Sequence, residues 1–209
     1  MATICQIGCG MIGKVMALDI SKRHDLHLSD LDSSALKEVE TLDPTIKTKC
    51  FNVNDRDMLK SFLKPADIVL IAVPGHMGYE LLEKMIDFKK NIVDISFSPE
   101  NILSLDKKAK DNNITVVFDA GLAPGIPNFL LGNIDAKENV KSFKYFVGGL
   151  PKHPKPPYNY KAPFSPIDVV EEYTRPARIM KNGKVITMPA LTDIEEKFYQ
   201  NTGMLEGFN

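Results

Sequence analysis

The sequence is poor in cysteine, balanced in charge and without a long apolar run. Its three cysteines, Cys5, Cys9 and Cys50, are odd in number and lack CxxC spacing, which argues against a disulfide framework and favours a reduced, cytoplasmic setting. The formal net charge is −1, so no overall field attracts nucleic acid or a membrane surface. No apolar run reaches the ~20 residues that cross a bilayer, and we expect no signal peptide.

Histidine is scattered along the chain. His24, His27, His76 and His153 form no pair with ligand spacing on one helix face, so we predict no metal site. What the chain does have is length and apolar content. With 209 residues and 44% hydrophobic content, it can build one well-buried core, or one domain and part of a second.

Residues 1–135 alternate strand-like and helix-like segments. The stretch "DIVLIAVP" is apolar throughout, as expected for a strand buried on both faces of a sheet. This alternation predicts an α/β Rossmann domain, in which helices cover both faces of a doubly wound parallel sheet. We expect Ser33 or Ser34 to cap the second helix, and Ser96 to cap a helix that begins at Pro99.

Residues 136–209 have a different sequence pattern, without the regular alternation of strand-like and helix-like segments. In the stretch "VKSFKYFVGGL", apolar and polar residues alternate as in a strand. The residues "KNGK" place Asn182 and Gly183 in a type I′ turn between two segments in which apolar residues also alternate. These features predict a second, smaller α+β domain with an antiparallel sheet. Because the chain ends in "GMLEGFN" without an evident closing strand or helix, we expect this second domain to be incomplete.

A glycine motif follows the first predicted strand and opens a helix. The residues "GCGMIG" fit G-x-G-x-x-G in the context that a dinucleotide-binding turn requires. The first glycine permits the tight turn, the second lets the backbone approach a pyrophosphate, and the third allows close packing of helix on strand. The expected cofactor contacts in this turn are Gly8, Gly10, Met11, Ile12 and Gly13.

An acid ends the second predicted strand. Asp30 is placed to accept hydrogen bonds from the ribose hydroxyls of a dinucleotide, and its charge would repel a 2′-phosphate. We therefore predict NAD rather than NADP as cofactor. Asp32 is expected to be a solvated turn residue.

Three later strands end on the same predicted rim. Ala72, Val73 and Pro74 follow the fourth strand and would pack along the nicotinamide ribose, although an ordinary strand-to-helix turn explains them equally well. Ser96, after the fifth strand, points towards the nicotinamide end of the crevice. Asp119 follows an apolar run after the sixth strand, where poor solvation would raise a carboxyl pKa and suit a general base. Its alternative role is to cap the turn that follows.

Several motifs taken together resemble the saccharopine dehydrogenase-like family, and most closely its lysine 6-dehydrogenase branch. They are "GCGMIG", "DISF", "DAGLAPGIPN", "VGGLPKHPKPPYNYKAPFSP", "EYTRPARIMKNGKV" and "MPAL". The resemblance implies an NAD(P)-binding domain, an inserted α+β substrate domain and a C-terminal return to the first domain, and we expect that return to be missing here. Ala123 and Phe97 depart from the aspartate and tyrosine of saccharopine reductases, and so favour a smaller substrate than saccharopine.

The resemblance also implies an activity and a substrate site. It suggests a dimeric or other homo-oligomeric enzyme that oxidises the amine of an amino acid, namely lysine, to 2-aminoadipate 6-semialdehyde by hydride transfer to NAD. Asp119 would be the base or would orient the ammonium. Two alternatives stay open, a saccharopine-type reductase and a non-catalytic NAD-binding regulatory protein. The expected substrate contacts are Gly148, Gly149, Asn159, Tyr160 and Ser165.

Overall fold

The chain forms two compact units in a computed structural model that describes residues 1–157 and 159–209. The first unit is Met1–Phe143 and the second is Lys144–Asn209. The boundary expected from the sequence, after residue 135, coincides with the end of helix α6 (Ile126–Asp135), and it stays a prediction.

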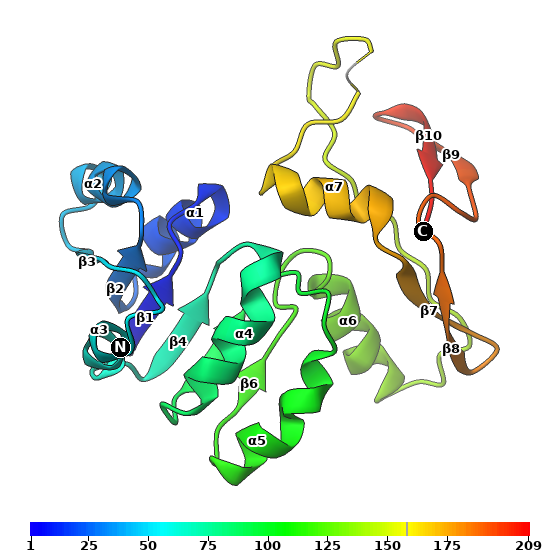
Figure 1. The fold of residues 1–209 in the computed structure, drawn as a ribbon. Helices are drawn as coiled ribbons and strands as arrows, with labels where there is room; N and C mark the ends of the chain where they lie inside the picture. The colour runs from blue at the N-terminus through cyan, green and yellow to red at the C-terminus, as the bar shows by residue number, and fades with distance from the viewer. Residues whose placement is uncertain (158) are drawn as a thin grey trace. The chain divides into compact units, whose positions relative to one another are not determined.

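A six-stranded parallel sheet forms the centre of the first unit (Figure 1). Its spatial order is β3-β2-β1-β4-β5-β6, and every neighbouring pair is parallel. This order confirms the predicted doubly wound sheet. The strands are β1 (Thr3–Ile7), β2 (Asp25–Asp30), β3 (Lys47–Cys50), β4 (Ile68–Ile71), β5 (Asn91–Asp94) and β6 (Val116–Val117).

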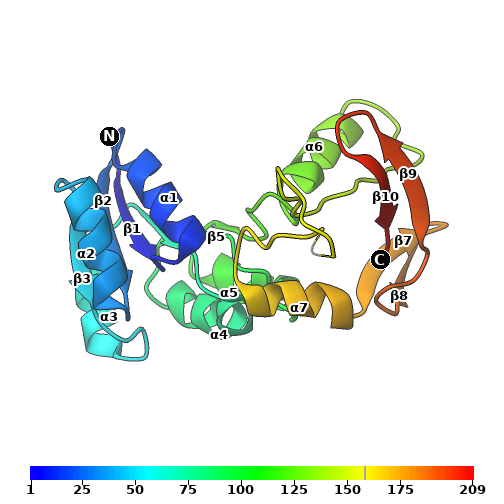
Figure 2. The same cartoon turned by 90° about the horizontal axis from the view of Figure 1, so that it is seen from above.

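Helices join successive strands of this sheet and bury both of its faces (Figures 1 and 2). They are α1 (Met11–Ile20), α2 (Ser33–Leu42), α3 (Arg56–Leu63), α4 (Gly75–Ile86), the 3₁₀ helix η1 (Ile102–Leu105) and α5 (Asp106–Asp111). Helix α6 follows the last strand of the sheet and has no buried residues.

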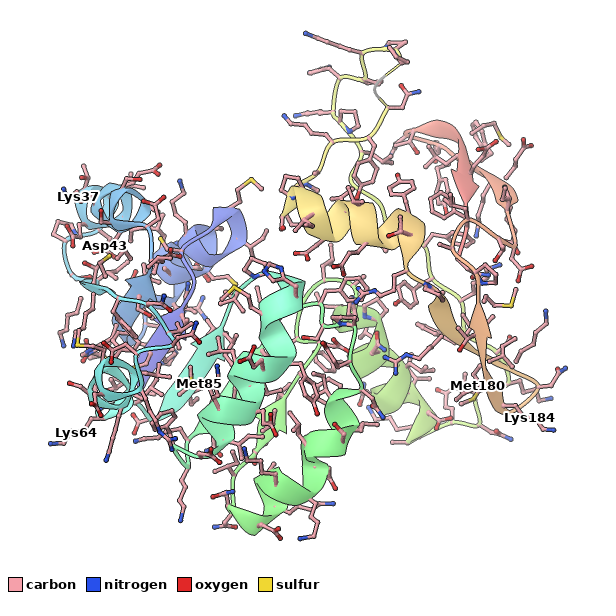
Figure 3. All side chains as sticks on the ribbon, viewed as in Figure 1. Lys37, Asp43, Lys64, Met85, Met180 and Lys184 are labelled. Carbon is pink, nitrogen blue, oxygen red and sulfur yellow. The ribbon has the colours of Figure 1, made fainter. Side chains whose placement is uncertain are left out.

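Two apolar clusters cover the two faces. One cluster joins Ile4 of β1 to residues of α1 and α2, and the other joins Cys5 and Ile7 of the same strand to residues of α3 and α4. Alternate side chains of one strand therefore enter opposite layers, as the pleat requires. Met85 of α4, labelled in Figure 3, is fully buried in the second of these clusters, whereas Lys64 lies at the surface.

The start of α2 differs from the prediction. Asp32, rather than Ser33 or Ser34, is the N-cap, and its side chain accepts hydrogen bonds from the backbone N–H groups of Ser34 and Ala35. An extended aspartate one residue earlier satisfies two helix donors at once, which a serine inside the first turn does not do. Asp32 is thus a helix cap and not only a solvated turn residue.

The second unit contains helix α7 (Pro166–Thr174) and two antiparallel hairpins, β7 (Ala177–Lys181) with β8 (Lys184–Met188) and β9 (Glu195–Tyr199) with β10 (Gly203–Gly207). Asn182 and Gly183 both have positive φ, 52° and 72°, which confirms the predicted turn between β7 and β8.

Two expectations for the second unit were wrong. Residues 140–150 form no strand in the described structure, because their alternating pattern meets no partner strand there. Conversely, the stretch ending in "GMLEGFN" does form a strand, β10, which pairs with β9. Strand β9 is rich in charged residues, so its sequence lacks the alternation of apolar and polar side chains that predicts a strand.

Candidate functional site

Loops leave the central sheet at the carboxyl ends of its strands, and backbone hydrogen bonds hold them in one row. These ends share one edge of a parallel sheet, and the strand order reverses between β1 and β4, where an open α/β sheet forms its ligand crevice. The bonds run from Gly8 N to Ser29 O (2.9 Å), Ala72 N to Ile7 O (2.8 Å), Ile95 N to Ile71 O (3.0 Å) and Ala120 N to Asp94 O (2.9 Å). The expected site residues of the first unit therefore follow a single edge.

The three glycines of the turn have three different geometries. Gly8 has φ +104°, and a Cβ there would lie 2.1 Å from Ala72 O, so both its conformation and its surroundings require glycine. A Cβ on Gly13 would lie 2.3 Å from Gly8 O, because helix and turn pack closely. Gly10 is different. Its φ is −67°, and a Cβ there would meet no atom of the described chain within 4 Å.

The first turn of α1 faces this open space. Gly10 is the N-cap and provides no capping side chain, and Met11 and Ile12 begin the helix with 53% and 41% of their surface exposed. A helix N-terminus carries backbone N–H groups without intrahelical partners and a partial positive charge. The helix thus starts without a capping side chain, and the missing side chain of Gly10 leaves an open space beside its N-terminus. These two features suit the binding of a pyrophosphate.

Asp30 ties two loops together. Its Oδ2 accepts a hydrogen bond from Cys9 N at 2.6 Å, and its Oδ1 accepts one from Asp32 N at 2.8 Å. The side chain is partly exposed at the end of β2. The carboxylate thus fixes the glycine turn against the β2–α2 turn, and its remaining lone pairs are available to a ribose diol.

The loop after β4 leads directly into α4. Ala72 and Val73 are partly buried, and Pro74 is exposed at the N-cap position of that helix. The structure therefore places these residues beside the glycine turn, since Gly8 packs against the carbonyl of Ala72. Their contact with nicotinamide ribose stays a prediction.

Ser96 lies against α4 rather than at a helix start. It is 4% exposed, and a Cβ added to Gly78 of α4 would lie 2.6 Å from its Cβ. The cap predicted for it is provided instead by Asn101, whose side chain accepts from Leu103 N at the start of η1. The helix begins later than Pro99 suggested, so Ser96 is too far along the chain to cap it.

Asp119 follows β6 in a left-handed backbone conformation, with φ +49°. Few residues other than glycine, asparagine and aspartate adopt this region readily. The helix that follows, α6, has Gly125 as its N-cap, and Gly125 N donates to Asn128 Oδ1 at 3.4 Å. The N-cap of that helix is therefore not Asp119.

A second acid, which the sequence analysis missed, lies next to Asp119. Asp94, the last residue of β5, is 1% exposed, and its carboxylate accepts a hydrogen bond from Ser96 N at 2.8 Å. Burial raises the pKa of Asp94 to about 6; bonds from Ser96 oppose this shift, and the charge of Asp119 adds to it. An aspartate at the end of an apolar strand was the available sequence signal.

The pKa of Asp94 predicts how stability depends on pH. Because its folded pKa, about 6, lies above the ordinary aspartate value of 3.8, its favourable contribution is complete below pH 3.8 and is lost as pH rises through about 6. Asp94→Asn should therefore raise the free energy of unfolding at neutral pH by about 1–3 kcal/mol and change it little near pH 4. Urea denaturation at both pH values checks this. An equal effect at both would contradict it.

In the second unit, two of the expected substrate contacts lie together. A Cβ on Gly149 would lie 3.2 Å from Tyr160 Cζ, and Lys161 N donates to Gly149 O at 2.9 Å. The Tyr160 hydroxyl donates to Glu172 Oε2 of α7 at 3.3 Å. Burial raises the pKa of Glu172, and Glu172 was missed because it reads as one charge on an ordinary helix.

The remaining expected substrate contacts are less enclosed. Gly148 and Asn159 are exposed, and a Cβ on Gly148 would meet no described atom within 4 Å. Ser165 is the N-cap residue of α7, although no side-chain capping bond forms there. Their role in substrate binding stays a prediction. Outside residue 158, the structure brings no three His, Cys, Asp or Glu together as a metal site.

Across residues 1–157 and 159–209, we find no helix with the length and apolar character that a bilayer crossing requires.

The glycine turn, the acid at the end of β2 and the doubly wound sheet define the first unit as a dinucleotide-binding domain. Residues 4–117 match the saccharopine dehydrogenase NADP binding domain, and residues 121–209 match the saccharopine dehydrogenase C-terminal domain. The chain belongs to the saccharopine dehydrogenase family. This confirms the family resemblance, and the cofactor class that it supports is NAD(P).

Individual relatives agree with the family. The mitochondrial alpha-aminoadipic semialdehyde synthase of Rattus norvegicus is 27% identical over 192 residues, 87% of this chain and 21% of the relative. Saccharopine dehydrogenase [NADP(+), L-glutamate-forming] of Pyricularia oryzae is 30% identical over 141 residues, 64% of this chain and 31% of the relative. The chain thus spans less than a third of these relatives. None of these names is a lysine 6-dehydrogenase.

A solved structure has the same fold. Apo saccharopine dehydrogenase (L-Glu forming) from Saccharomyces cerevisiae matches with a TM-score of 0.71 and 18% identity, over 100% of this chain and 49% of that one.

Proposed function

We propose that the protein is an oxidoreductase that oxidises the amine of an amino acid by hydride transfer to NAD, with lysine as substrate and 2-aminoadipate 6-semialdehyde as product. The observation that carries the proposal is the edge of the sheet, where a turn suited to a dinucleotide lies in one row with Asp119. Ala123 and Phe97, which depart from the saccharopine reductase pattern, favour the smaller substrate.

The residues of this chain would divide the work as follows. Gly8, Gly10 and Gly13 would hold the pyrophosphate against α1, and Asp30 would hold the ribose. NAD, when bound, would supply the hydride acceptor for the carbon that bears the amine. Asp119 takes a proton from the substrate ammonium, so that the nitrogen lone pair can assist hydride departure. Water then hydrolyses the resulting imine to the aldehyde and ammonia.

Asp94 fits this role for Asp119. Asp94 is buried, and burial raises its pKa to about 6, with the charge of Asp119 adding to the shift. A neighbouring carboxyl group that holds its proton up to about pH 6 would leave Asp119 as the charged member of the two at lower pH. A base that titrates close to working pH transfers protons most effectively.

The cofactor preference gives a separate prediction. We expect NADH to bind at least about tenfold more tightly than NADPH, because Asp30 holds the ribose diol and repels a 2′-phosphate. Asp30→Ala should weaken NADH binding by roughly 1–3 kcal/mol, because charge-assisted hydrogen bonds are lost. Titration of intrinsic NADH and NADPH fluorescence measures both.

The matched control for that experiment is Asp30→Asn, which keeps the size of the side chain but removes its charge. It should narrow the difference between NADH and NADPH. The preference is contradicted if the unaltered protein binds NADPH as tightly as NADH. That outcome would agree with the NADP(+) in the name of the Pyricularia oryzae relative.

The same relative favours a second candidate, a saccharopine-type reductase. This enzyme would condense an aldehyde with the amine of glutamate and reduce the product. Reduced-cofactor consumption that requires both glutamate and 2-aminoadipate 6-semialdehyde would identify it. A non-catalytic NAD-binding regulator would instead bind NADH tightly without turnover. The cytoplasmic setting and the homo-oligomer stay predictions.

A further inference from the structure

A glutamine lies where the sheet would otherwise be apolar. Gln6, in the middle of β1, is fully buried, and the strand residues around it, Ile4, Cys5 and Ile7, are also buried. A buried carboxamide costs free energy unless its polar atoms find partners. Cofactor binding by the glycine turn does not by itself explain why position 6 carries a polar side chain.

The partners of Gln6 are the two ends of the glycine turn. Its Nε2 donates to Gly8 O at 2.8 Å and to Gly13 O at 2.7 Å, so the amide uses both of its N–H bonds on the turn. Its Oε1 is buried and finds no hydrogen-bond partner within residues 1–157 and 159–209. The fold therefore bears the cost of an unpaired buried oxygen to keep these two contacts.

These contacts fix the orientation of one peptide group. The carbonyl of the Gly8–Cys9 peptide accepts a hydrogen bond from Gln6 Nε2, and the N–H of the same peptide donates to Asp30 Oδ2 at 2.6 Å. A peptide held at both ends cannot rotate, and the next residue, Gly10, starts α1. Gln6 and Asp30 together thus determine where the first N–H groups of that helix point.

We propose that Gln6 is the positioning residue of the dinucleotide turn and that it sets the affinity of this protein for the pyrophosphate of its cofactor. The proposal rests on the dinucleotide binding within the proposed function, and not on the oxidation of an amine. It requires that Gln6 act on every ligand with a pyrophosphate, and on none that lacks one. NADH, NADPH and adenosine are probes that separate these cases.

Gln6→Met tests the proposal with little change of volume. The variant leaves the Gly8 carbonyl without its Nε2 donor but also removes the unpaired Oε1, so the two effects on stability oppose each other and the melting temperature should fall by only a few degrees. Its affinity for NADH and for NADPH should each fall about tenfold or more, while its affinity for adenosine, followed by ligand-detected NMR, changes less than about twofold.

Ser29→Ala is the matched control. Ser29 is equally buried, and its hydroxyl donates to the backbone carbonyl of Gln6 at 3.4 Å without touching the turn carbonyls. This variant should leave all three affinities unchanged within about twofold. The proposal is overturned if Gln6→Met binds NADH as the unaltered protein does, or if adenosine binding falls as much as NADH binding.

Gln6→Glu keeps the test decisive if the methionine variant does not fold. A protonated glutamic acid can donate to one turn carbonyl, whereas a carboxylate repels both. NADH affinity of this variant, relative to the unaltered protein, should recover as pH falls, which a purely structural defect would not produce. Absence of that recovery overturns the proposal. An equal loss for NADH and NADPH supports it whichever cofactor the protein prefers and whether or not it oxidises lysine.

Discussion

Gly10→Val is expected to abolish NADH binding and to leave the fold intact. The backbone of Gly10, at φ −67°, is open to any L-residue, and a Cβ there meets no described atom within 4 Å. The valine side chain would occupy the space that we assign to the pyrophosphate. The NADH dissociation constant should rise at least about 100-fold, and the melting temperature should change by only a few degrees.

The other glycines of the turn serve as controls in the same experiment. Gly10→Ala should weaken NADH binding by a smaller amount, because it adds one methyl group. Gly13→Val should instead destabilise the protein, since a Cβ would lie 2.3 Å from Gly8 O. Normal NADH binding by Gly10→Val would mean that the turn is only structural, and the cofactor site would have to be sought elsewhere.

Asp119→Asn is expected to reduce lysine-dependent turnover by about 100-fold or more, because a positioned general base contributes on that scale. Asparagine also tolerates the left-handed conformation of this residue, at φ +49°, so the backbone should not change. NADH binding should stay within about twofold of normal. Initial rates of NADH formation and NADH titrations measure the two effects.

Asp57→Asn is the matched control for that substitution, because Asp57 is an exposed acid in the first turn of α3. It should leave turnover unchanged. If the turnover number of Asp119→Asn were close to that of the unaltered protein, Asp119 would not be the base, and its role would be structural, in the turn where its φ is positive. A loss of turnover together with a loss of NADH binding would show that the substitution had disturbed the cofactor site.

Much of the first unit, and one turn of the second, could be predicted from local patterns. The apolar strand at Ile68–Ile71 and the glycine motif depend on neighbouring residues alone, and so does the turn at Asn182 and Gly183. Parallel topology followed from the alternation of strands and helices. In each case the physical cause, strand burial or backbone conformation, acts within a few residues of the signal.

The parts that could not be predicted depend on contacts between distant segments. The hydrogen bond from the Gln6 side chain to Gly13 O exists only because Gly13 folds back over β1. The burial of Asp94 likewise arises only where the ends of β5 and β6 meet. Glu172 is one charge on a helix until Tyr160 contacts it. Apolar periodicity contains no information on which buried polar groups find each other.

The most direct test of the account is the absorbance of NADH in a solution of the purified protein, NAD and a panel of amino acids that includes lysine and saccharopine. We predict NADH formation that depends on lysine, requires Asp119 and is much slower with NADP. NADH that binds tightly to the protein, with no turnover of any amino acid in the panel, would contradict the account.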